Sequence, residues 1–402
     1  MLYYSLEEKD NDICKNRFFN SSKMKILYIL KHNPWGIGGG CFACRNYLQL
    51  FTTIFSNAAF DVCICEEYLE AKHEKEYPMV NFIPVKGRGK INKYLIPFTG
   101  VLHRHNDVAK HLLSQNKYDY CIFDHNSIAG SIVGLCKKIG VKTIVLNHNF
   151  EYDYFRDNNS IMKCLLLLPQ IKRNEKKSYL GCDYNIFLTE EDKEQFAKVY
   201  GKSQTVSIVG GCFNDKNYVN NKQDIPPLHR NGLQMVISGS MCNVQNLDGI
   251  NYFFDELYPL VPRDISIVFT GKNPPASLVK RINELTPRVT LKANPQDIDS
   301  IVSQCDIFLC PARLGGGMKL RVMDGLRNGL PVLAHEVSAR GYRDFEKKGI
   351  LYRFTDKEDF FKKLMLIVEE LHDAKLSRDN IMITANEMFS FDAAVKKIKS
   401  YL

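Results

Sequence analysis

The sequence predicts an α/β protein made of two tandem Rossmann-like, doubly wound domains that face a cleft. Three observations support this prediction. The chain has 402 residues, which is too long for one core of ordinary size and suits two domains of about 200 residues. Short apolar runs alternate with helical patterns along most of the chain, as in parallel sheets covered by helices. A polar, turn-prone stretch interrupts this alternation near the middle.

The apolar runs form two series of expected strands. The first series covers residues 24–30, 60–65, 80–85, 118–123, 143–146, 184–188 and 205–209. The second covers residues 233–238, 265–270, 289–292, 306–310, 332–334 and 350–352. We therefore expect an N-terminal extension at 1–22, a first domain at 23–212, a linker at 213–232, a second domain at 233–385 and a C-terminal helix at 386–402 that returns to the first domain.

Composition is that of an ordinary globular protein. Apolar residues make up 45% and charged residues 25% of the chain, and no apolar run approaches the ~20 residues that cross a bilayer. The N-terminus lacks the basic and apolar regions of a signal peptide, so we expect a cytoplasmic protein. Its 13 cysteines are then reduced thiols. Cys41 and Cys44 have the spacing of a zinc or redox pair, but no second pair accompanies them, and we expect no metal.

The net charge of +9 indicates an acidic partner, which could be nucleotide phosphate, nucleic acid or anionic lipid. Since the basic residues are dispersed, we expect no nucleic-acid partner. Basic residues concentrate around the apolar stretch within residues 86–110. This combination suits either contact with a membrane surface or an ordinary solvated face.

Residues 311–333 join an expected strand, a triple-glycine loop and a helix that leads to the next strand. Gly316 and Gly317 let backbone amides approach a ligand, and the helix N-terminus behind them favours an anion. Lys319 and Arg321 fall in the expected first turn, where each positive charge costs about 0.3–1 kcal/mol. A bound phosphate would offset that cost, and Asp324 could accept a hydrogen bond from a sugar hydroxyl. The alternative is a glycine-rich turn beside solvated charges.

The dipeptide His-Asn follows three expected strands of the first domain, as His32-Asn33, His125-Asn126 and His148-Asn149. Carboxyl ends of parallel strands meet at one edge of the sheet, where ligands bind. The three pairs therefore indicate either a polar wall or a coincidence of common loop residues. A zinc site is poorly supported, because no spacing fixes its geometry.

A second glycine loop follows the first strand and includes Gly38 and Gly39. It misses the G-x-G-x-x-G pattern, because Cys41 stands where the third glycine belongs. A dinucleotide site is therefore disfavoured.

Together these features resemble the GT-B glycosyltransferases, in particular the retaining family 4, over nearly the whole chain from Met24. The resemblance implies that the first domain holds the acceptor and the second binds a nucleotide sugar, UDP- or GDP-linked, with no other cofactor. It implies that Lys319 lies near the diphosphate and that Asp324 holds the ribose in place of the usual glutamate. The segment that begins at Ser238 and contains Gly239 is similar to the opening of the family's second domain, with Asn246 capping the next helix.

For the first domain the resemblance implies that His148 lies beside the transferred sugar and that the loop of Gly38 and Gly39 faces the diphosphate. Glu151 follows His148 in the same segment. The sequence departs from the family pattern at Gly316, where many members have an acid, and it lacks their basic pair after Gly239.

These observations predict a retaining, metal-independent glycosyltransferase that acts on a glycan or lipid-linked acceptor in surface polysaccharide synthesis. His148 is its candidate catalytic residue. The expected donor-binding residues are Gly38, Gly39, Gly239, Gly316, Gly317, Lys319, Arg321 and Asp324. The expected acceptor-side residues are His32, Asn33, His125, Asn126, Asn149 and Glu151. A GT-B nucleotide-sugar epimerase and a binding or chaperone subunit without catalysis remain alternatives.

Overall fold

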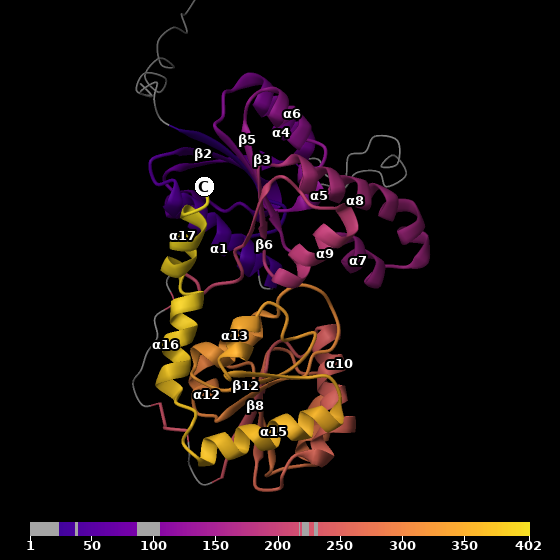
Figure 1. The fold of residues 1–402 in the computed structure, drawn as a ribbon, viewed down its shortest axis with the longest axis vertical. Coiled ribbons are helices and arrows are strands. Elements are labelled where there is room, and N and C mark those ends of the chain that lie inside the picture. The colour runs from indigo at the N-terminus through magenta and orange to yellow at the C-terminus, as the bar shows by residue number, and fades with distance from the viewer. Residues whose placement is uncertain (1–23, 37–38, 87–104, 217, 219–224, 229–231) are drawn as a thin grey trace, which may run out of the picture.

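The computed structural model describes residues 24–36, 39–86, 105–216, 218, 225–228 and 232–402. They fold into two α/β domains, one above the other in Figure 1, each built on a parallel sheet. All thirteen expected strands are present, with ends that differ from the prediction by no more than two residues. The predicted fold class is therefore confirmed.

The first sheet has seven strands in the order β3-β2-β1-β4-β5-β6-β7. Its strands are β1 (Lys25–Ile29), β2 (Ala59–Cys65), β3 (Val80–Val85), β4 (Tyr120–Phe123), β5 (Lys142–Asn147), β6 (Tyr184–Phe187) and β7 (Val206–Val209). Its helices are α1 (Gly39–Ile54), α2 (Ala71–Glu76), α4 (His105–Gln115), α5 (Asn126–Ala129), α6 (Val133–Lys138), α7 (Glu151–Asp157), α8 (Ile161–Gly181) and α9 (Glu190–Tyr200). Successive residues of β1 belong to separate core clusters, Tyr28 to one and Leu27 to the other, because neighbouring side chains of a strand point to opposite faces.

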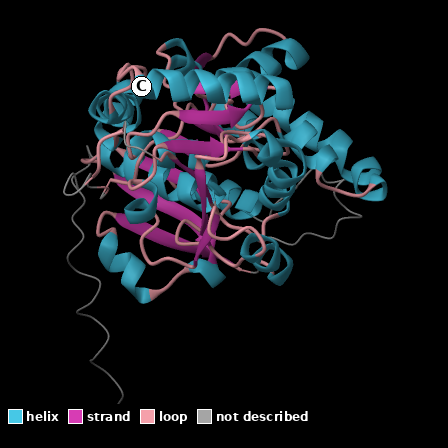
Figure 2. Ribbon diagram, turned by 90° about the horizontal axis from the view of Figure 1, so that it is seen from below, coloured by secondary structure: helices cyan, strands magenta, loops and turns pink. Residues whose placement is uncertain are grey.

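The second sheet has six strands in the order β10-β9-β8-β11-β12-β13. Its strands are β8 (Gln234–Ser238), β9 (Ser266–Gly271), β10 (Val289–Ala293), β11 (Ile307–Cys310), β12 (Val332–His335) and β13 (Leu351–Phe354). Its helices are α10 (Val244–Tyr252), α11 (Ala276–Asn283), α12 (Asp299–Val302), α13 (Leu320–Arg327), α14 (Arg343–Lys347), α15 (Lys357–His372) and α16 (Arg378–Phe389), and α17 (Phe391–Lys399) ends the chain. Viewed from below, helices flank the strands (Figure 2).

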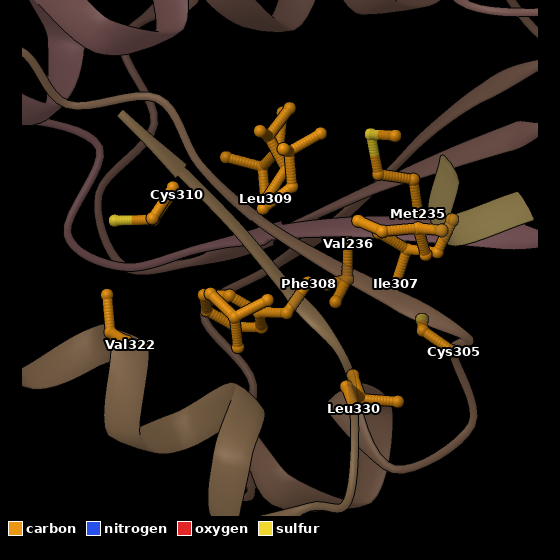
Figure 3. Close-up of a cluster of buried hydrophobic side chains, with 14 of the residues drawn as sticks. Met235, Val236, Cys305, Ile307, Phe308, Leu309, Cys310, Val322 and Leu330 are labelled. Atoms are coloured by element: carbon orange, nitrogen blue, oxygen red, sulfur yellow. The ribbon is translucent and has the colours of Figure 1, made fainter. Parts of the chain in front are cut away.

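Burial against the second sheet fixes the position of α13. One face of the helix is apolar and buried, since Val322, Met323 and Leu326 are all at most 1% exposed. Figure 3 shows Val322 on the same side of β11 as Phe308, while Leu309 points to the other side. The helix starts one residue later than the sequence suggested, with Lys319 as its N-cap residue rather than in its first turn.

The end of the chain connects the two domains. Helix α16 packs Ile381 and Phe389 into the core of the second domain. The chain turns at Ser390, whose hydroxyl accepts a hydrogen bond from the Ala393 amide at 3.2 Å. Helix α17 then buries Phe391 and Ile398 in the core of the first domain. The domains therefore share a C-terminal helical connection as well as the central linker.

Candidate functional site

In each sheet, the chain reverses the direction in which it adds strands next to the first strand of that domain. The reversal lies between β1 and β4 in the first sheet and between β8 and β11 in the second. Loops that follow these strands are the usual ligand-binding place of open α/β sheets. In this chain the loops of the two domains meet. The loop after β11 contacts the loop after β5, since a Cβ atom on Gly317 would lie 3.2 Å from the His148 carbonyl oxygen. The candidate site is therefore an interdomain cleft.

Ion pairs hold the two domains together beside this contact. Arg343, at the start of α14, pairs with Glu191 at 3.0 Å and Glu194 at 2.9 Å, both on α9. The Gly341 amide donates a further hydrogen bond to Glu191 at 3.2 Å. Because these side chains are partly exposed, each pair contributes little stability alone, but together they fix how the domains face each other.

Two helix N-termini face each other in the cleft. Helix α1 begins at Gly39, and a Cβ atom there would lie 3.6 Å from the side chain of Leu320, the first residue of α13. Each N-terminus presents free backbone amides and the positive end of a helix dipole. Gly38 lies outside the described residues. Two such ends, one from each domain, form a site suited to a diphosphate.

Lys319 directly precedes the first residue of α13, and hydrogen bonds fix its ammonium group and its backbone. Its Nζ donates to Gln245 Oε1 at 3.0 Å, and its backbone carbonyl accepts from the Tyr342 hydroxyl at 2.9 Å. Burial lowers the pKa of Lys319 to about 8, and the nearby cations Arg321 and Arg340 act in the same direction. A partly buried cation whose hydrogen-bond partner in the described part of the chain is a neutral amide is suited to an anionic ligand.

Arg321 lies on the first turn of α13 and reaches across to the end of β8. Its Nη1 donates to the Ser238 carbonyl at 3.4 Å, and a Cβ atom on Gly239 would lie 2.9 Å from its Cζ. Gly239 also has a φ of +131°, where a side chain would be strained. Glycine at 239 therefore makes room for the guanidinium.

Asp324 follows one turn later on α13. Its carboxylate pairs with Arg327 at 2.9 Å, and Arg327 also binds Asp299 at 3.0 Å and lies over the Tyr218 ring at 5.0 Å. Burial raises the pKa of Asp324 to about 6. The side chain is 25% exposed, so one side of the carboxylate remains accessible to a hydroxyl group.

A cavity of about 1000 Å³ opens between the domains next to the triple-glycine loop. Its walls come from α7 and α9 of the first domain and from the loops before α10 and after β11 and β12 of the second. Gly316 lines this cavity, and a Cβ atom there would meet nothing within 4 Å. Position 316 therefore has space for an acidic side chain.

The three histidines of the His-Asn pairs lie together in the first domain. The ring centroids of His32 and His125 are 5.8 Å apart, as are those of His125 and His148. Parallel strands β1, β4 and β5 are adjacent, so the residues that follow them share one edge. The predicted proximity of these histidines is confirmed.

Charged partners surround the histidine cluster. His148 Nε2 lies 3.2 Å from Asp124 Oδ1, and His125 Nε2 lies 3.0 Å from Glu151 and 3.2 Å from Lys31 Nζ. Burial opposes ionisation of Asp124, but the hydrogen bond and charge of His148 prevail and lower the pKa of this carboxyl. Burial and the Lys31 charge lower the pKa of His32 to about 3. His32 is therefore neutral at physiological pH.

The asparagines of the three pairs have separate roles. Asn33 accepts from the Trp35 amide at 3.0 Å and shapes the turn after β1. Asn126 is buried and donates to Glu175 at 3.1 Å, while Asn149 donates to Glu151 at 3.3 Å. Of the three, Asn149 lies nearest to the second domain, beside Gly317. Each of the three asparagines thus has a partner within the first domain, and Asn149 also lies beside the second domain.

Sequence reasoning missed Gln245, Asp124 and Lys31. Asp124 and Lys31 each precede a histidine of the cluster, and a charge at the end of a buried strand was a usable signal. No local signal identified Gln245 as the partner of Lys319, because the two are 74 residues apart.

The expected cap of α10 is wrong. Asn243, not Asn246, accepts from the Gln245 amide, at 2.9 Å, while Asn246 lies inside the helix and donates to the Ser240 carbonyl.

Two further features bear on the site. Among the described residues no group of three or more His, Cys, Asp or Glu side chains is arranged to hold a metal ion. No helix in the described ranges is long and apolar enough to cross a membrane. Residues 87–104, which include most of the basic segment at 86–110, lie outside the described part of the chain.

Comparisons with known proteins find similarity in sequence and in fold. Residues 232–370 match the family described as glycosyl transferases group 1. The chain is 21% identical over 281 residues to an uncharacterized 44.6 kDa protein in the cps region of Klebsiella pneumoniae. That match covers 65% of this chain and 65% of the Klebsiella protein, less than two thirds of its length.

Solved structures of the same fold cover nearly the whole chain. Sucrose-phosphate synthase from Thermosynechococcus elongatus has a TM-score of 0.66 at 12% identity, over 94% of this chain and 98% of the synthase. Anabaena HepE in complex with UDP has a TM-score of 0.66 at 12% identity, over 94% and 99% of the two chains. A glycosyltransferase from Rickettsia africae has a TM-score of 0.63 at 13% identity, over 94% and 97%. Residues 232–370 therefore resemble the group 1 glycosyl transferases, and the chain as a whole has the two-domain GT-B fold of these structures.

Proposed function

We propose that this chain transfers a sugar from a UDP- or GDP-linked donor to a glycan or lipid-linked acceptor in surface polysaccharide synthesis, at the cytoplasmic face of a membrane. The observation that carries the proposal is the meeting of two helix N-termini, at Gly39 and Leu320, beside the cations Lys319 and Arg321. Solved relatives with UDP and with UDP-glucose support the donor class. The relative in a cps region supports the pathway class.

The proposed mechanism depends on stabilising the negative charge that develops on the leaving diphosphate. Breaking the bond between the sugar C1 and the phosphate oxygen leaves negative charge on the diphosphate while the sugar becomes oxocarbenium-like. Preorganised amides and cations stabilise that charge in the transition state. Lys319, Arg321 and the two helix ends supply positive charge there, so we propose that transfer needs no metal.

The stereochemical part of the proposal is retention. The acceptor hydroxyl attacks C1 on the face that the diphosphate vacates, and its proton passes to the departing phosphate oxygen. His148, fixed by Asp124 at 3.2 Å, orients the donor sugar from the first domain. Closure of the two domains around the donor keeps the loop of His148 against the triple-glycine loop, which it already contacts.

A panel of nucleotide sugars tests the donor. The donor that binds should raise the midpoint of thermal unfolding, since a ligand at a hundredfold excess over its Kd stabilises the folded state by ~2.7 kcal/mol. Transfer is then measured with that donor and with glycan or lipid-linked acceptors, with and without a chelator. Loss of transfer in chelator that manganese or magnesium restores would refute metal independence.

The same assay separates the rival functions. An epimerase would convert or hydrolyse the nucleotide sugar equally well without an acceptor, whereas a transferase depends on one. A binding subunit would be stabilised by a donor and show no turnover under any condition. Product anomers, read by NMR, decide between retention and inversion.

A further inference from the structure

The first two turns of α8 form an exposed apolar surface that the proposed cleft chemistry does not use. Ile161 is 79% exposed, Met162 76% and Leu165 71%, and we name these three residues the α8 tip. The buried residues of this helix begin only at Leu167. Figures 1 and 2 show the helices of this region extending away from the first sheet. The α8 tip therefore projects beyond the body of the domain.

Charge along the rest of α8 has one sign on the exposed side. The exposed charged residues of the helix are Lys163, Lys172, Arg173, Lys176 and Lys177. The acid of this helix, Glu175, is fully buried and accepts hydrogen bonds from the Glu151 amide and the Tyr200 hydroxyl. On neighbouring α7, Asp153 and Asp157 are both paired with Arg156. The exposed side of α8 thus attracts an anionic surface.

The order of these residues along the helix matches the layers of a lipid monolayer. A helix rises 1.5 Å per residue, so Leu165 and Lys172 are separated by roughly 10 Å. Membrane-surface helices bury apolar side chains about 5–10 Å into the boundary between headgroups and acyl chains. With the α8 tip at that depth and the helix tilted into the bilayer, the basic residues from Lys172 onward lie nearer the lipid phosphates. Lys163, within the tip, reaches the phosphates with its long side chain.

We propose that the α8 tip inserts into an anionic lipid bilayer while the basic residues that follow it bind the lipid phosphates. A second copy of the chain fits the surface less well. Three side chains cover much less than the roughly 800 Å² per partner of a stable interface, and two basic helix faces would repel each other.

This docking surface adjoins the interdomain cavity. Asp153, Tyr154 and Arg156 of α7 line the cavity, and α7 ends at Asp157, four residues before Ile161. A bilayer on the α8 tip would therefore lie beside the mouth of the cavity, where a lipid-linked acceptor could enter. This use of the surface rests on the proposed function, whereas docking itself does not.

Co-sedimentation with vesicles tests docking directly. The full chain should bind vesicles that contain phosphatidylglycerol and bind pure phosphatidylcholine much more weakly, with binding that decreases as salt rises. The triple change Ile161→Gln, Met162→Gln and Leu165→Gln should lower the partition coefficient by about tenfold or more. The double change Lys172→Gln and Lys176→Gln should lower it by roughly tenfold on anionic vesicles and flatten the salt dependence.

A matched control removes three exposed apolar residues elsewhere. Phe361 and Leu366 on α15 and Ile383 on α16 are 43%, 38% and 50% exposed, and their joint change to Gln should leave vesicle binding unaltered. Equal losses of vesicle binding in the control and test variants would overturn the proposal. A parent chain that does not bind vesicles would overturn it as well. Dimerisation of the parent through the α8 tip would also overturn the proposal. Sedimentation equilibrium would then show a dimer for the parent and a monomer for the triple variant alone.

Measuring nucleotide binding separates a failure of the docking proposal from a failure of the proposed function. The triple variant should keep the circular dichroism spectrum and the UDP-sugar affinity of the parent, because the α8 tip does not contact the donor site. Vesicle binding without any donor binding would reject the transferase and leave docking standing. Donor binding and transfer to a water-soluble acceptor, with vesicle binding absent, would reject docking alone.

Discussion

Gly317 of the second domain lies directly against Asn149 of the first, closer than a side chain on Gly317 would permit. Its φ of +67° adds a backbone conformation that L-residues rarely adopt. The contact joins the triple-glycine loop to the residue that follows His148. Glycine at 317 thus favours the arrangement in which the two domains meet.

We expect Gly317→Ala to weaken transfer through this contact. The left-handed backbone alone costs an alanine about 1–2 kcal/mol, and the methyl group would push Asn149 away. Transfer efficiency should therefore fall by about tenfold or more, with the domains more open in small-angle scattering. Gly316→Ala is the control, because its methyl group would meet nothing within 4 Å. Similar losses in both variants would contradict the role given to the contact.

Lys319 should give donor binding a characteristic pH dependence. Its pKa of about 8 in the free protein means that the ammonium is present below pH 8 and is lost as pH rises through that value. A bound diphosphate favours the charged form, so UDP affinity should be flat below pH 8 and fall by up to about tenfold per unit above it. Calorimetric titration of UDP from pH 6.5 to 9.5 measures this dependence.

Two substitutions check that assignment. Lys319→Arg keeps a cation that does not titrate in this range, so UDP binding should lose its pH dependence. Lys319→Ala should weaken UDP binding by about tenfold or more, since a charged hydrogen bond contributes about 1.5–3 kcal/mol. An unaltered affinity in Lys319→Ala would reject the donor site.

Asp124 should act as a positioning residue for His148. Asp124→Asn keeps the shape of the side chain and removes the charge that fixes the imidazole at 3.2 Å. We expect kcat to fall by roughly 10²-fold with little change in donor KM, together with an altered pH profile of kcat.

The control for Asp124 is another buried carboxylate of the first sheet. Asp61 binds Tyr118 and Asn81 near the opposite end of the strands. Asp61→Asn should reduce thermal stability without changing the pH profile of kcat. Matching pH profiles in both variants would mean that Asp124 has a structural role only.

Gly316 should accept an acidic side chain. Gly316→Glu places a carboxylate in the open space next to the cavity, where it could accept hydrogen bonds from sugar hydroxyls. We expect the variant to fold with the stability of the parent and to alter the ranking of donor sugars in the nucleotide-sugar panel. An unfolded variant, or an identical ranking, would show that this position does not face the sugar.

The sequence alone determined the fold and the individual loops. Apolar periodicity located the strands within two residues, because burial on both faces of a parallel sheet demands continuous apolar runs. The three histidines were located because each lies within three residues of a strand end, and Lys319 because it follows the triple-glycine loop. Local rules were enough wherever the cause of a structure lies within one turn or one strand of the chain.

Only the tertiary structure decided which groups meet. Gln245 holds Lys319 from 74 residues away, Arg321 fills the space left by Gly239, and Gly317 touches Asn149. Tertiary packing also exposed the α8 tip, whose Ile161, Met162 and Leu165 look like core residues in sequence. Sequence patterns report whether a residue suits burial, but the packing of distant elements determines which face is covered and which charge finds a partner.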